Sequence, residues 1–355
     1  MLDYSKLFDA VRNSYAYASY HRRSGKALMP LRYFFELTYR CNLNCPYCYV
    51  GANRTKDELS TEEWKKVIRQ IPFYSIVTLV GGEPLIRQDF AEILEAVSKR
   101  TFSKVNLVTN GILINDELID LFIKNKLLLL SVSLDGYEKN HDINRNREGI
   151  FDKIYNNLEK IAQRKKHPLV DIKTIILPNN LDDMVDLYKM CDKFNFDFFS
   201  VSFLRNNNLK QNSVLQNSFI PEYNMDYPIE LYFDIDHFKE VFKEINSLSK
   251  KSNVKLRFAP KFEQFENYID KIEEFFTNPQ KSVNEIYKPC LFPFSNTFIT
   301  PCGDIYPCLS MKIGNVRENT IKNIFNMPNY RCFRKNLKAQ GVFSACQMCC
   351  ELSVK

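Results

Sequence analysis

Three cysteines stand within eight positions of one short stretch, RCNLNCPYCY, which covers residues 40–49. Their spacing is C-x3-C-x2-C, and neither a fourth cysteine nor a histidine lies beside them. A structural zinc site needs four ligands, so zinc would require a ligand from a distant part of the chain. A 4Fe-4S cluster takes one external ligand at each iron, so Cys41, Cys45 and Cys48 would leave one iron open to bind another molecule.

A second group of cysteines lies towards the other end of the chain. Cys290 and Cys308 are separated by seventeen residues, and Cys346 and Cys349 follow as a C-x2-C pair. Two distant cysteines that join such a pair suit either zinc or a second iron-sulfur cluster. The spacing alone leaves both interpretations open.

The remaining four cysteines belong to neither set. Cys191 repeats with Met184 and Leu187 on one apolar helical face, so we expect it in the core. The other three are candidates for a replacement ligand, a hydrogen-atom donor or a proton relay, and they are Cys302, Cys332 and Cys350.

The composition is that of an ordinary globular protein, with 355 residues, 45% hydrophobic and 26% charged. No apolar run approaches the roughly 18–20 residues of a membrane span, and no signal-peptide core is present, so we expect a cytoplasmic protein without a membrane partner. Thiols stay reduced there, and eleven clustered cysteines then indicate metal or redox chemistry. The net charge of +7 comes from dispersed lysines, which predicts a solvated surface and no nucleic-acid partner.

Short apolar runs recur through the first 205 residues, with helical patterns between them. Continuous runs of this kind suit strands buried on both faces, and they cover residues 33–37, 76–80, 105–109, 127–133, 170–176 and 198–203. Ser60 with Glu63 forms a capping box ahead of one helix, and Asp89 with Glu92 repeats the device. Six βα units in series predict a parallel sheet, either doubly wound or curved into a barrel.

The chemistry of such a sheet belongs at the C-terminal ends of its strands. The first run leads into Cys41, the second into GGEP at 81–84, the third into TNG at 109–111 and the fourth into SLDG at 133–136. We therefore expect four strand ends to converge on one mouth. Asn110 and Asp135 also suit turns, so either could be a turn former instead of a ligand.

The cysteine spacing, with Tyr47 just before the last cysteine, resembles the cluster loop of the radical S-adenosylmethionine (radical SAM) enzymes. In that family the open iron binds the amino and carboxylate groups of SAM, whose reductive cleavage gives a 5′-deoxyadenosyl radical that abstracts substrate hydrogen. The resemblance covers most of residues 32–205. It implies an α/β fold, a partial (β/α)6 TIM-like barrel over 31–205 that follows an N-terminal extension over 1–30. It also implies a SAM-binding 4Fe-4S cluster, SAM, and an electron donor such as flavodoxin or ferredoxin.

Two strand ends carry residues that the resemblance places around SAM. Gly81, Gly82 and Glu83 match the GGEP motif that receives the SAM ammonium, because glycine permits close backbone approach and Glu83 supplies an acceptor. Asn110 resembles the polar residue that ends the third strand near the SAM ribose.

The segment SVSLDGYEKNHDINRNREG supplies the remaining polar contacts that the resemblance implies. Ser133 and Arg145 look like the pair that holds the SAM carboxylate in peptide- and sulfatase-modifying members, with Arg147 as an alternative. Tyr47 and Phe203 would offer backbone and apolar contact to adenine. His141 and Asp142 are interpreted as loop or supporting residues instead of a catalytic pair.

The C-terminal cysteines resemble the SPASM and Twitch extensions of radical SAM enzymes, in which a G-x4-C element closes a hairpin. Gly303-x4-Cys308 fits that element, whereas the downstream C-x5-C-x3-C part of a full SPASM pattern is missing. The resemblance thus implies a small iron-sulfur domain over 286–355, with one auxiliary 4Fe-4S cluster on four cysteines, namely Cys290, Cys308, Cys346 and Cys349. Zinc remains the alternative for this site.

The segment 206–285 between the two units carries no assignable motif, and we expect it to shape the substrate cavity. The Asn-rich residues 206–217 predict a loop, and residues 235–250 a helix beside the barrel.

Three functional hypotheses follow. The first is hydrogen abstraction from a peptide or protein side chain, giving an oxidation, crosslink or epimerisation, and the SLDG segment favours it. The second is dehydrogenation or epimerisation of a small hydroxylated metabolite such as a sugar or aminocyclitol. The third is a non-catalytic iron-sulfur scaffold or sensor. We expect an enzyme, because a sensor has no need of the complete SAM-binding residues.

Overall fold

The computed structural model describes residues 4–48, 50, 57–204, 234–261, 283–308, 312–343, 346 and 349–355, with side chains from residue 11 onwards in the first helix. The Asn-rich loop predicted over residues 206–217 lies outside the described residues. None of the helices within these ranges has the length and apolar character needed to cross a membrane.

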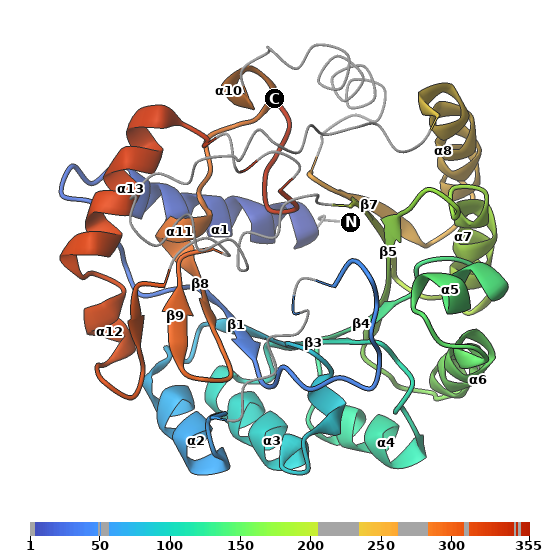
Figure 1. Ribbon diagram of the computed structural model, residues 1–355, viewed down its shortest axis with the longest axis horizontal. Coiled ribbons are helices and arrows are strands. Elements are labelled where there is room, and N and C mark those ends of the chain that lie inside the picture. Colours follow the sequence, from blue (N-terminus) through green and yellow to red (C-terminus); the bar gives the residue numbers. More distant parts are fainter. Residues whose placement is uncertain are drawn as a thin grey trace.

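Seven parallel strands curve into a partial barrel, with helices on its outer side (Figure 1). The strands are β1 (Arg32–Glu36), β2 (Ile76–Val80), β3 (Val105–Thr109), β4 (Leu129–Ser133), β5 (Leu169–Ile176), β6 (Phe198–Phe203) and β7 (Lys255–Ala259). The connecting helices are α2 (Thr61–Gln70), the short η1 (Pro84–Ile86), α3 (Phe90–Thr101), α4 (Asp116–Lys124), α5 (Lys139–Asn144), α6 (Ile150–Ala162), α7 (Asp183–Lys193) and α8 (Ile235–Ser249). The predicted α/β class, the six strands and the helix beside the barrel are confirmed.

The seventh strand was not predicted. In β7 only Phe258 is buried, whereas Lys255 and Arg257 are exposed, so no continuous apolar run marks it. This pattern is that of an edge strand, which pairs with β6 on one side only.

The C-terminal part extends the same sheet. It contains α10 (Val283–Ile286), α11 (Phe292–Ser295), β8 (Asn296–Ile299), β9 (Asp304–Tyr306), β10 (Gly314–Asn315), α12 (Ile321–Ile324) and α13 (Pro328–Gln340), and the N-terminal helix α1 (Tyr4–Tyr20) packs against α11. Strand β8 pairs with β1 in parallel and then with β9 in the hairpin that Gly303 closes. The strand order is β10-β9-β8-β1-β2-β3-β4-β5-β6-β7, so the cysteine-rich segment is joined to the barrel through its backbone.

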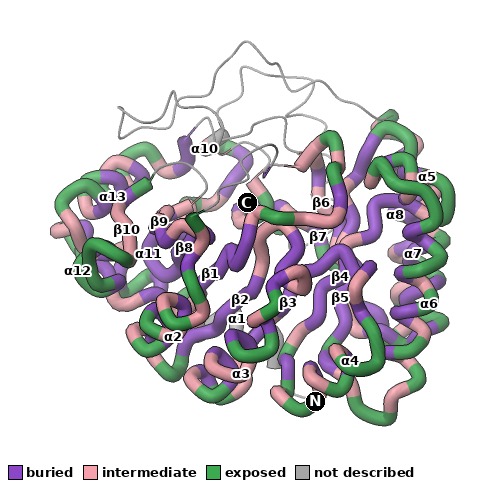
Figure 2. Tube along the Cα trace, turned by 60° about the horizontal axis from the view of Figure 1, so that its bottom comes forward, coloured by how far each residue is buried: buried purple, intermediate pink, exposed green. Residues whose placement is uncertain are grey.

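The core lies between the strands and the inner faces of the helices (Figure 2). Cys191 is fully buried beside Met184 and Leu187, which confirms its predicted core position. Trp64 of α2 is also fully buried and packs on Phe35 of β1, with ring centroids 5.1 Å apart.

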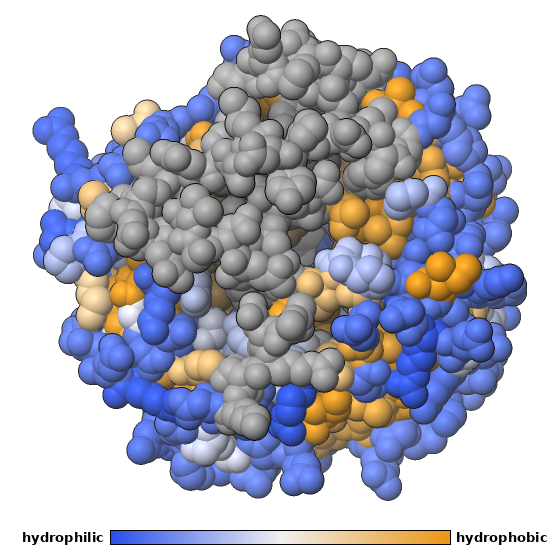
Figure 3. Space-filling model, viewed as in Figure 1, coloured by the Kyte–Doolittle hydropathy of each residue, from blue (hydrophilic) through white to orange (hydrophobic). Residues whose placement is uncertain are grey.

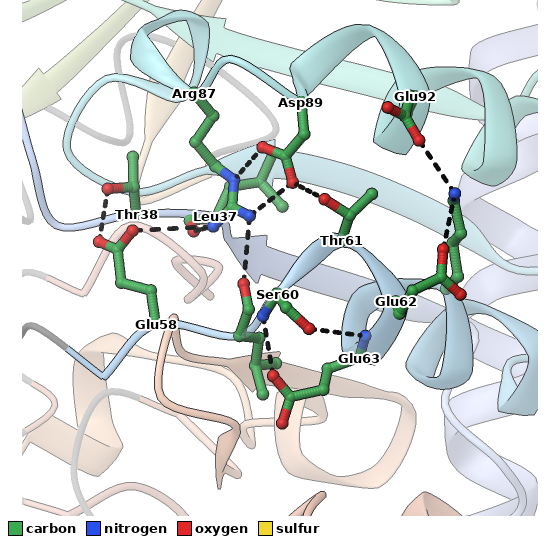
Figure 4. Close-up of polar contacts among 12 residues, drawn as sticks. Leu37, Thr38, Glu58, Ser60, Thr61, Glu62, Glu63, Arg87, Asp89 and Glu92 are labelled. Atoms are coloured by element: carbon green, nitrogen blue, oxygen red, sulfur yellow. Dashed lines mark hydrogen bonds and ion pairs between the residues drawn. The ribbon is translucent and has the colours of Figure 1, made fainter.

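The helix starts are only partly as predicted. Ser60 and Glu63 form the expected capping box, in which each side chain accepts a hydrogen bond from the backbone of the other. Asp89 stands at the start of α3 but makes no side-chain cap, which corrects the prediction. Its carboxylate instead accepts from Arg87 and from the Thr61 hydroxyl (Figure 4). A buried guanidinium offers a charged partner, and such bonds are stronger than a cap to neutral N–H groups.

Candidate active site

A single cavity of about 500 Å³ is lined by both cysteine sets. Its wall includes Cys41, Cys45, Cys48, Cys290, Cys308, Cys346 and Cys349, together with the strand-end residues Gly81, Gly82, Asn110, Ser133 and Asp135. Figure 3 shows hydrophobic patches exposed among the hydrophilic residues on this face of the molecule. The predicted convergence of four strand ends on one mouth is therefore present.

The two glycines of GGEP lie against the base of the cysteine loop. A Cβ on Gly82 would stand 2.3 Å from the Arg40 carbonyl oxygen, and one on Gly81 would stand 2.4 Å from that of Thr38. Two backbone bonds complete the contact, from Gly82 N to the Thr38 oxygen at 2.7 Å and from Glu83 N to the Arg40 oxygen at 2.9 Å. The close approach that the sequence suggested is thus between two backbone segments, and it fixes where the cysteine loop begins.

The Glu83 carboxylate is fully buried behind this wall. It accepts from Asn110 N at 2.8 Å, from the Thr109 hydroxyl at 2.9 Å and from Leu85 N at 3.1 Å. Burial raises the pKa of Glu83 to about 7, although all three hydrogen bonds favour the carboxylate. Glu83 is not part of the cavity wall, so its contact with the SAM ammonium stays a prediction, while its visible action is to position Asn110.

Hydrogen-bond donors surround two of the three loop thiols. Leu43 N donates to Cys41 Sγ at 3.4 Å and Asn110 Nδ2 lies 3.9 Å from the same atom. Arg145 Nη1 lies 3.8 Å from Cys45 Sγ. Donors to sulfur stabilise thiolates and influence the reduction potential of an iron-sulfur cluster. The three cysteines and their surroundings therefore fit a cluster with one open iron.

Asp135 connects the cysteine loop to the following loop and to β5. Its carboxylate pairs with Arg145 Nη2 and accepts from the Tyr47 hydroxyl at 2.6 Å and from Ile175 N at 2.8 Å. Only 1% of Asp135 is exposed. The sequence left open whether this residue is a turn former or a ligand, and the structure makes it the residue that orients Arg145 and Tyr47 at the cavity.

One guanidinium nitrogen of Arg145 makes no hydrogen bond among the described residues. This atom, Nε, is buried, and the residue lines the cavity. A buried N–H without a partner is costly, so a carboxylate at this place would satisfy it. The alternative, Arg147, binds the Asn42 carbonyl at 3.0 Å near the surface and is absent from the cavity wall. The geometry thus fits Arg145 to the SAM carboxylate.

Phe203 does not reach the cavity, which corrects its expected contact with adenine. Its side chain is buried on the outer side of β6, 5.8 Å from the Phe238 ring of α8. Alternation along the strand places Ser202 at the cavity wall instead. Lys173 of β5, the register partner of Ser133, lines the wall as well and was missed. Strand alternation is the signal that could have found both.

The second cysteine set lines the same cavity. Burial raises the pKa of Cys290, and the nearby thiols of Cys346, Cys349 and Cys308 raise it further, so the four thiols lie within electrostatic reach of one another. Among the described residues no three Cys, His, Asp or Glu side chains stand close enough to hold one metal ion. A 4Fe-4S cluster does not require this, because each thiolate binds a different iron. The donor set fits such a cluster.

Stacked phenyl rings form part of the cavity wall. Phe34 of β1 stacks on Phe298 at 4.5 Å and on Phe292 at 5.8 Å, and the Arg32 guanidinium lies 4.4 Å above the Phe34 ring. This wall is apolar, and Arg32 is the charged residue that lies against it, whereas Lys173 lines the same cavity from β5. The phenyl wall is suited to shelter a reactive species from water.

A parallel barrel with an open cysteine triad and a second cysteine set on one cavity defines an iron-sulfur protein with a cofactor-binding mouth. Residues 35–191 match the family model described as the radical SAM superfamily, and residues 290–350 match SPASM, an iron-sulfur cluster-binding domain. These matches identify a radical SAM domain over residues 35–191 and a SPASM domain over residues 290–350. The cofactors of the chain are accordingly a SAM-binding 4Fe-4S cluster, SAM and auxiliary iron-sulfur chemistry in the SPASM part.

Two curated relatives show different ranges of similarity. The sporulation killing factor maturation protein SkfB of Bacillus subtilis is 30% identical over 166 residues, which cover 46% of this chain and 40% of SkfB. The chain thus matches less than half the length of that relative. The AdoMet-dependent heme synthase of Methanosarcina barkeri is 28% identical over 325 residues, 89% of this chain and 87% of that protein.

Solved structures share the fold. Streptococcus suis SuiB bound to the precursor peptide SuiA gives a TM-score of 0.64 at 17% identity, covering 87% of this chain and 67% of SuiB. The protein anSMEcpe with bound AdoMet and the Cp18Cys peptide gives 0.58 at 21% identity, covering 90% and 86%.

Proposed function

We propose that the protein uses SAM-derived radical chemistry to abstract hydrogen from a peptide or protein side chain, with net oxidation of the substrate. One observation carries this proposal: Asn110, Ser133 and Arg145, which we expect to bind SAM, and both cysteine sets line the same cavity. When bound there, the cluster and SAM supply a 5′-deoxyadenosyl radical, and an auxiliary cluster supplies a one-electron acceptor. The peptide-bound relatives SuiB and anSMEcpe, which share the fold, support the substrate class.

The protein's own residues bind, orient and exclude water. Cys41, Cys45 and Cys48 would hold the first cluster, while Ser133 and Arg145 would hold the SAM carboxylate from two neighbouring segments. The Asp135 carboxylate keeps the Arg145 side chain against the cavity, so the donor geometry exists before SAM arrives. Such preorganisation lowers the cost of binding and of correct orientation.

The auxiliary site is the second part of the proposal. Cys290, Cys308, Cys346 and Cys349 would hold one 4Fe-4S cluster in the same cavity as the SAM site. The phenyl wall of this cavity would receive an apolar part of the substrate and keep water away from it.

The test follows hydrogen from substrate to product. Reconstituted protein is reduced with dithionite and supplied with SAM and a deuterated extract of the source organism, divided into peptide and small-molecule fractions. We expect deuterium to appear in 5′-deoxyadenosine with the peptide fraction only. Treating that fraction with protease before the assay should abolish the labelling. Label from the small-molecule fraction alone would overturn the peptide assignment. The Cys41→Ala, Cys45→Ala, Cys48→Ala variant, which should form no 5′-deoxyadenosine, is the control.

A second candidate is a carboxylate-bearing macrocycle of the heme type. It is favoured by the heme synthase relative, which aligns over 89% of this chain, by the stacked phenyl wall with Arg32 against it, and by Lys173 on the wall of the same cavity. Planar rings stack on such faces, and the two cations suit carboxylates. Titration with hemin tests it: a shifted Soret band that is lost in Phe298→Ala would support this candidate, and an unshifted band would exclude it.

A further inference from the structure

An arginine occupies a core position of α13. Tyr330, Phe333, Arg334 and Leu337 follow the i, i+3, i+4, i+7 spacing of one helical face, and each is at most 2% exposed. Arg334 itself has no exposed surface. A charged side chain is almost never fully buried without a partner, so this position requires a physical reason.

The contacts of Arg334 leave its charge without a carboxylate. Its Nε donates to the Pro293 carbonyl at 2.7 Å and Nη1 donates to the Gly25 carbonyl at 3.2 Å. The guanidinium stacks on the rings of Tyr330 at 3.8 Å and Phe325 at 4.2 Å. Nη2 has no partner, and no acidic side chain of the described residues pairs with the group. Dipoles and ring faces satisfy the donors in part, but they do not neutralise a full charge.

The cation persists at neutral pH. Burial lowers the pKa of Arg334 to about 10, which still leaves the guanidinium protonated at pH 7. An uncompensated cation in a place of low polarity attracts negative charge strongly, because the interaction is weakly screened there.

Arg334 is linked to the second cysteine set through α11 and through the residues beside it on α13. Pro293, which accepts from Arg334, belongs to α11, and α11 follows Cys290 by one residue. Phe333 and Leu337 lie on the same helical face as Arg334 and line the cavity with all four cysteines of that set. A 4Fe-4S cluster on four thiolates is anionic, gains one negative charge on reduction, and has a reduction potential that depends on surrounding charge.

We propose that Arg334 is the counter-charge of the auxiliary site: it holds α11 beside Cys290 and stabilises negative charge on the four thiolates, which makes the site easier to reduce. This inference rests on the proposed function, in which Cys290, Cys308, Cys346 and Cys349 bind one 4Fe-4S cluster. Arg334 is a positioning residue in this account, since it touches neither substrate nor the reacting atoms.

The test measures the reduction potential of the auxiliary cluster and does not depend on enzyme activity. The full chain with Cys41→Ala, Cys45→Ala and Cys48→Ala isolates the auxiliary signal, which is followed by EPR during an anaerobic redox titration. Adding Arg334→Gln should lower the potential, and Arg334→Lys should lower it less, because the ammonium keeps the charge but cannot bond both carbonyls and stack. A merely structural arginine would change the denaturation midpoint and leave the potential where it was.

Arg331→Gln is the matched control. Arg331 lies on the same helix, is half-buried, and donates through Nε to the Ser24 carbonyl at 3.0 Å, next to the segment that Arg334 binds. Solvent screens its charge, so its removal should leave the potential unchanged.

The outcomes separate two failures. If the triple cysteine variant retains no iron, the auxiliary assignment is wrong and Arg334 loses its proposed role with it. If it retains about four irons and Arg334→Gln has the same potential, only the counter-charge is wrong. Should Arg334→Gln not fold, Arg334→Met decides in its place: methionine removes the charge but keeps an apolar side chain in the core, and an unshifted potential in that variant overturns the inference equally.

Discussion

The Tyr47 hydroxyl donates a hydrogen bond to Asp135 Oδ2 at 2.6 Å, across 88 positions of sequence. Tyr47 belongs to the cysteine loop, whereas Asp135 follows β4 and also pairs with Arg145. One buried carboxylate therefore sets the position of the cluster loop and of the arginine proposed for SAM. Loop placement and SAM binding should consequently respond together when this carboxylate is changed.

We expect Asp135→Asn to weaken SAM binding and the fold together. The amide keeps the size but lacks the charge, and an NH2 in place of Oδ2 would face the donors of Tyr47 and Arg145, while Ile175 N could still donate to Oδ1. Loss of one partner of a buried pair costs about 3 kcal/mol in the free energy of unfolding. An arginine that is no longer oriented should weaken the Kd for SAM about tenfold or more, measured by calorimetry on reconstituted protein.

Asp142→Asn is the control for that experiment. Its carboxylate accepts from Gly149 N at 2.6 Å and Phe151 N at 2.9 Å, and it lies away from the cavity wall. This variant should bind SAM as the wild type does. Equal SAM affinity in Asp135→Asn and Asp142→Asn would show that Asp135 does not position Arg145.

His141 should make the fold sensitive to acid. It is fully buried, its Nδ1 accepts from Asp135 N at 3.0 Å, and burial followed by the charge of Arg145 lowers its pKa to about 4, against the opposite influence of Asp135 and Asp142. The unfolded state, with a histidine pKa near 6.5, therefore binds the proton first. Stability is fully present above pH 6.5 and is lost as the pH falls towards 4, by about 3 kcal/mol over the whole window.

The variant His141→Asn keeps an acceptor for Asp135 N and removes the titration. Urea unfolding followed by circular dichroism at pH 7 and pH 5 would measure the effect. We expect the wild type to lose about 2 kcal/mol more than the variant between these values. An equal loss in both proteins would mean that other groups cause the acid sensitivity.

The barrel was readable from the sequence because strands buried on both faces are continuous apolar runs. A continuous apolar run does not, however, show which of its side chains face the cavity. In β6 the sequence favoured Phe203 as the apolar contact, whereas alternation turns Ser202 inward and buries Phe203 against α8. Strand β7 was missed for the converse reason, since Lys255 and Arg257 interrupt its apolar pattern.

The cysteine sets and GGEP were predictable because their spacing is local. The contacts that position them were not, because they join distant segments. Ile175 N reaches Asp135 across 40 residues, and Arg334 reaches Gly25 across 309. No periodicity or propensity contains such pairs, so only the folded structure reveals Asp135 and Arg334 as positioning residues.

Gly82→Ala should remove the SAM-site cluster while leaving the auxiliary one. The new Cβ would stand 2.3 Å from the Arg40 carbonyl oxygen and 2.8 Å from its carbonyl carbon, both backbone atoms that cannot turn away. The base of the cysteine loop must then shift. After anaerobic reconstitution we expect iron to fall from about eight to about four per chain.

Gly149→Ala separates loop displacement from simple backbone strain. Gly149 has φ +71°, and a Cβ there meets nothing within 4 Å. That variant should cost about 1 kcal/mol of stability and retain its iron. Full iron content in Gly82→Ala would contradict the contact between GGEP and the cysteine loop.

Arg87 should contribute strongly to the free energy of unfolding, because it joins the segments on either side of the cysteine loop. It is 7% exposed and donates to the Leu37 carbonyl at 2.9 Å, to the Leu59 carbonyl at 3.1 Å and to Asp89 (Figure 4). Arg87→Met would leave these acceptors and a half-buried carboxylate without their donor. Breaking such a pair costs about 3–5 kcal/mol in the free energy of unfolding, measured with urea.

Lys65→Met shows why burial decides the size of that effect. Lys65 bridges Glu62 at 2.9 Å and Glu92 at 3.0 Å, which are shorter than the 3.1 Å bond from Arg87 to the Leu59 carbonyl, but both carboxylates are exposed to solvent. Water already satisfies those charges, so the loss should stay below about 1 kcal/mol and shrink with added salt. The loss in Arg87→Met should exceed it severalfold and respond little to salt. Comparable losses in the two variants would show that Arg87 does not anchor the segment from which the cysteine loop departs.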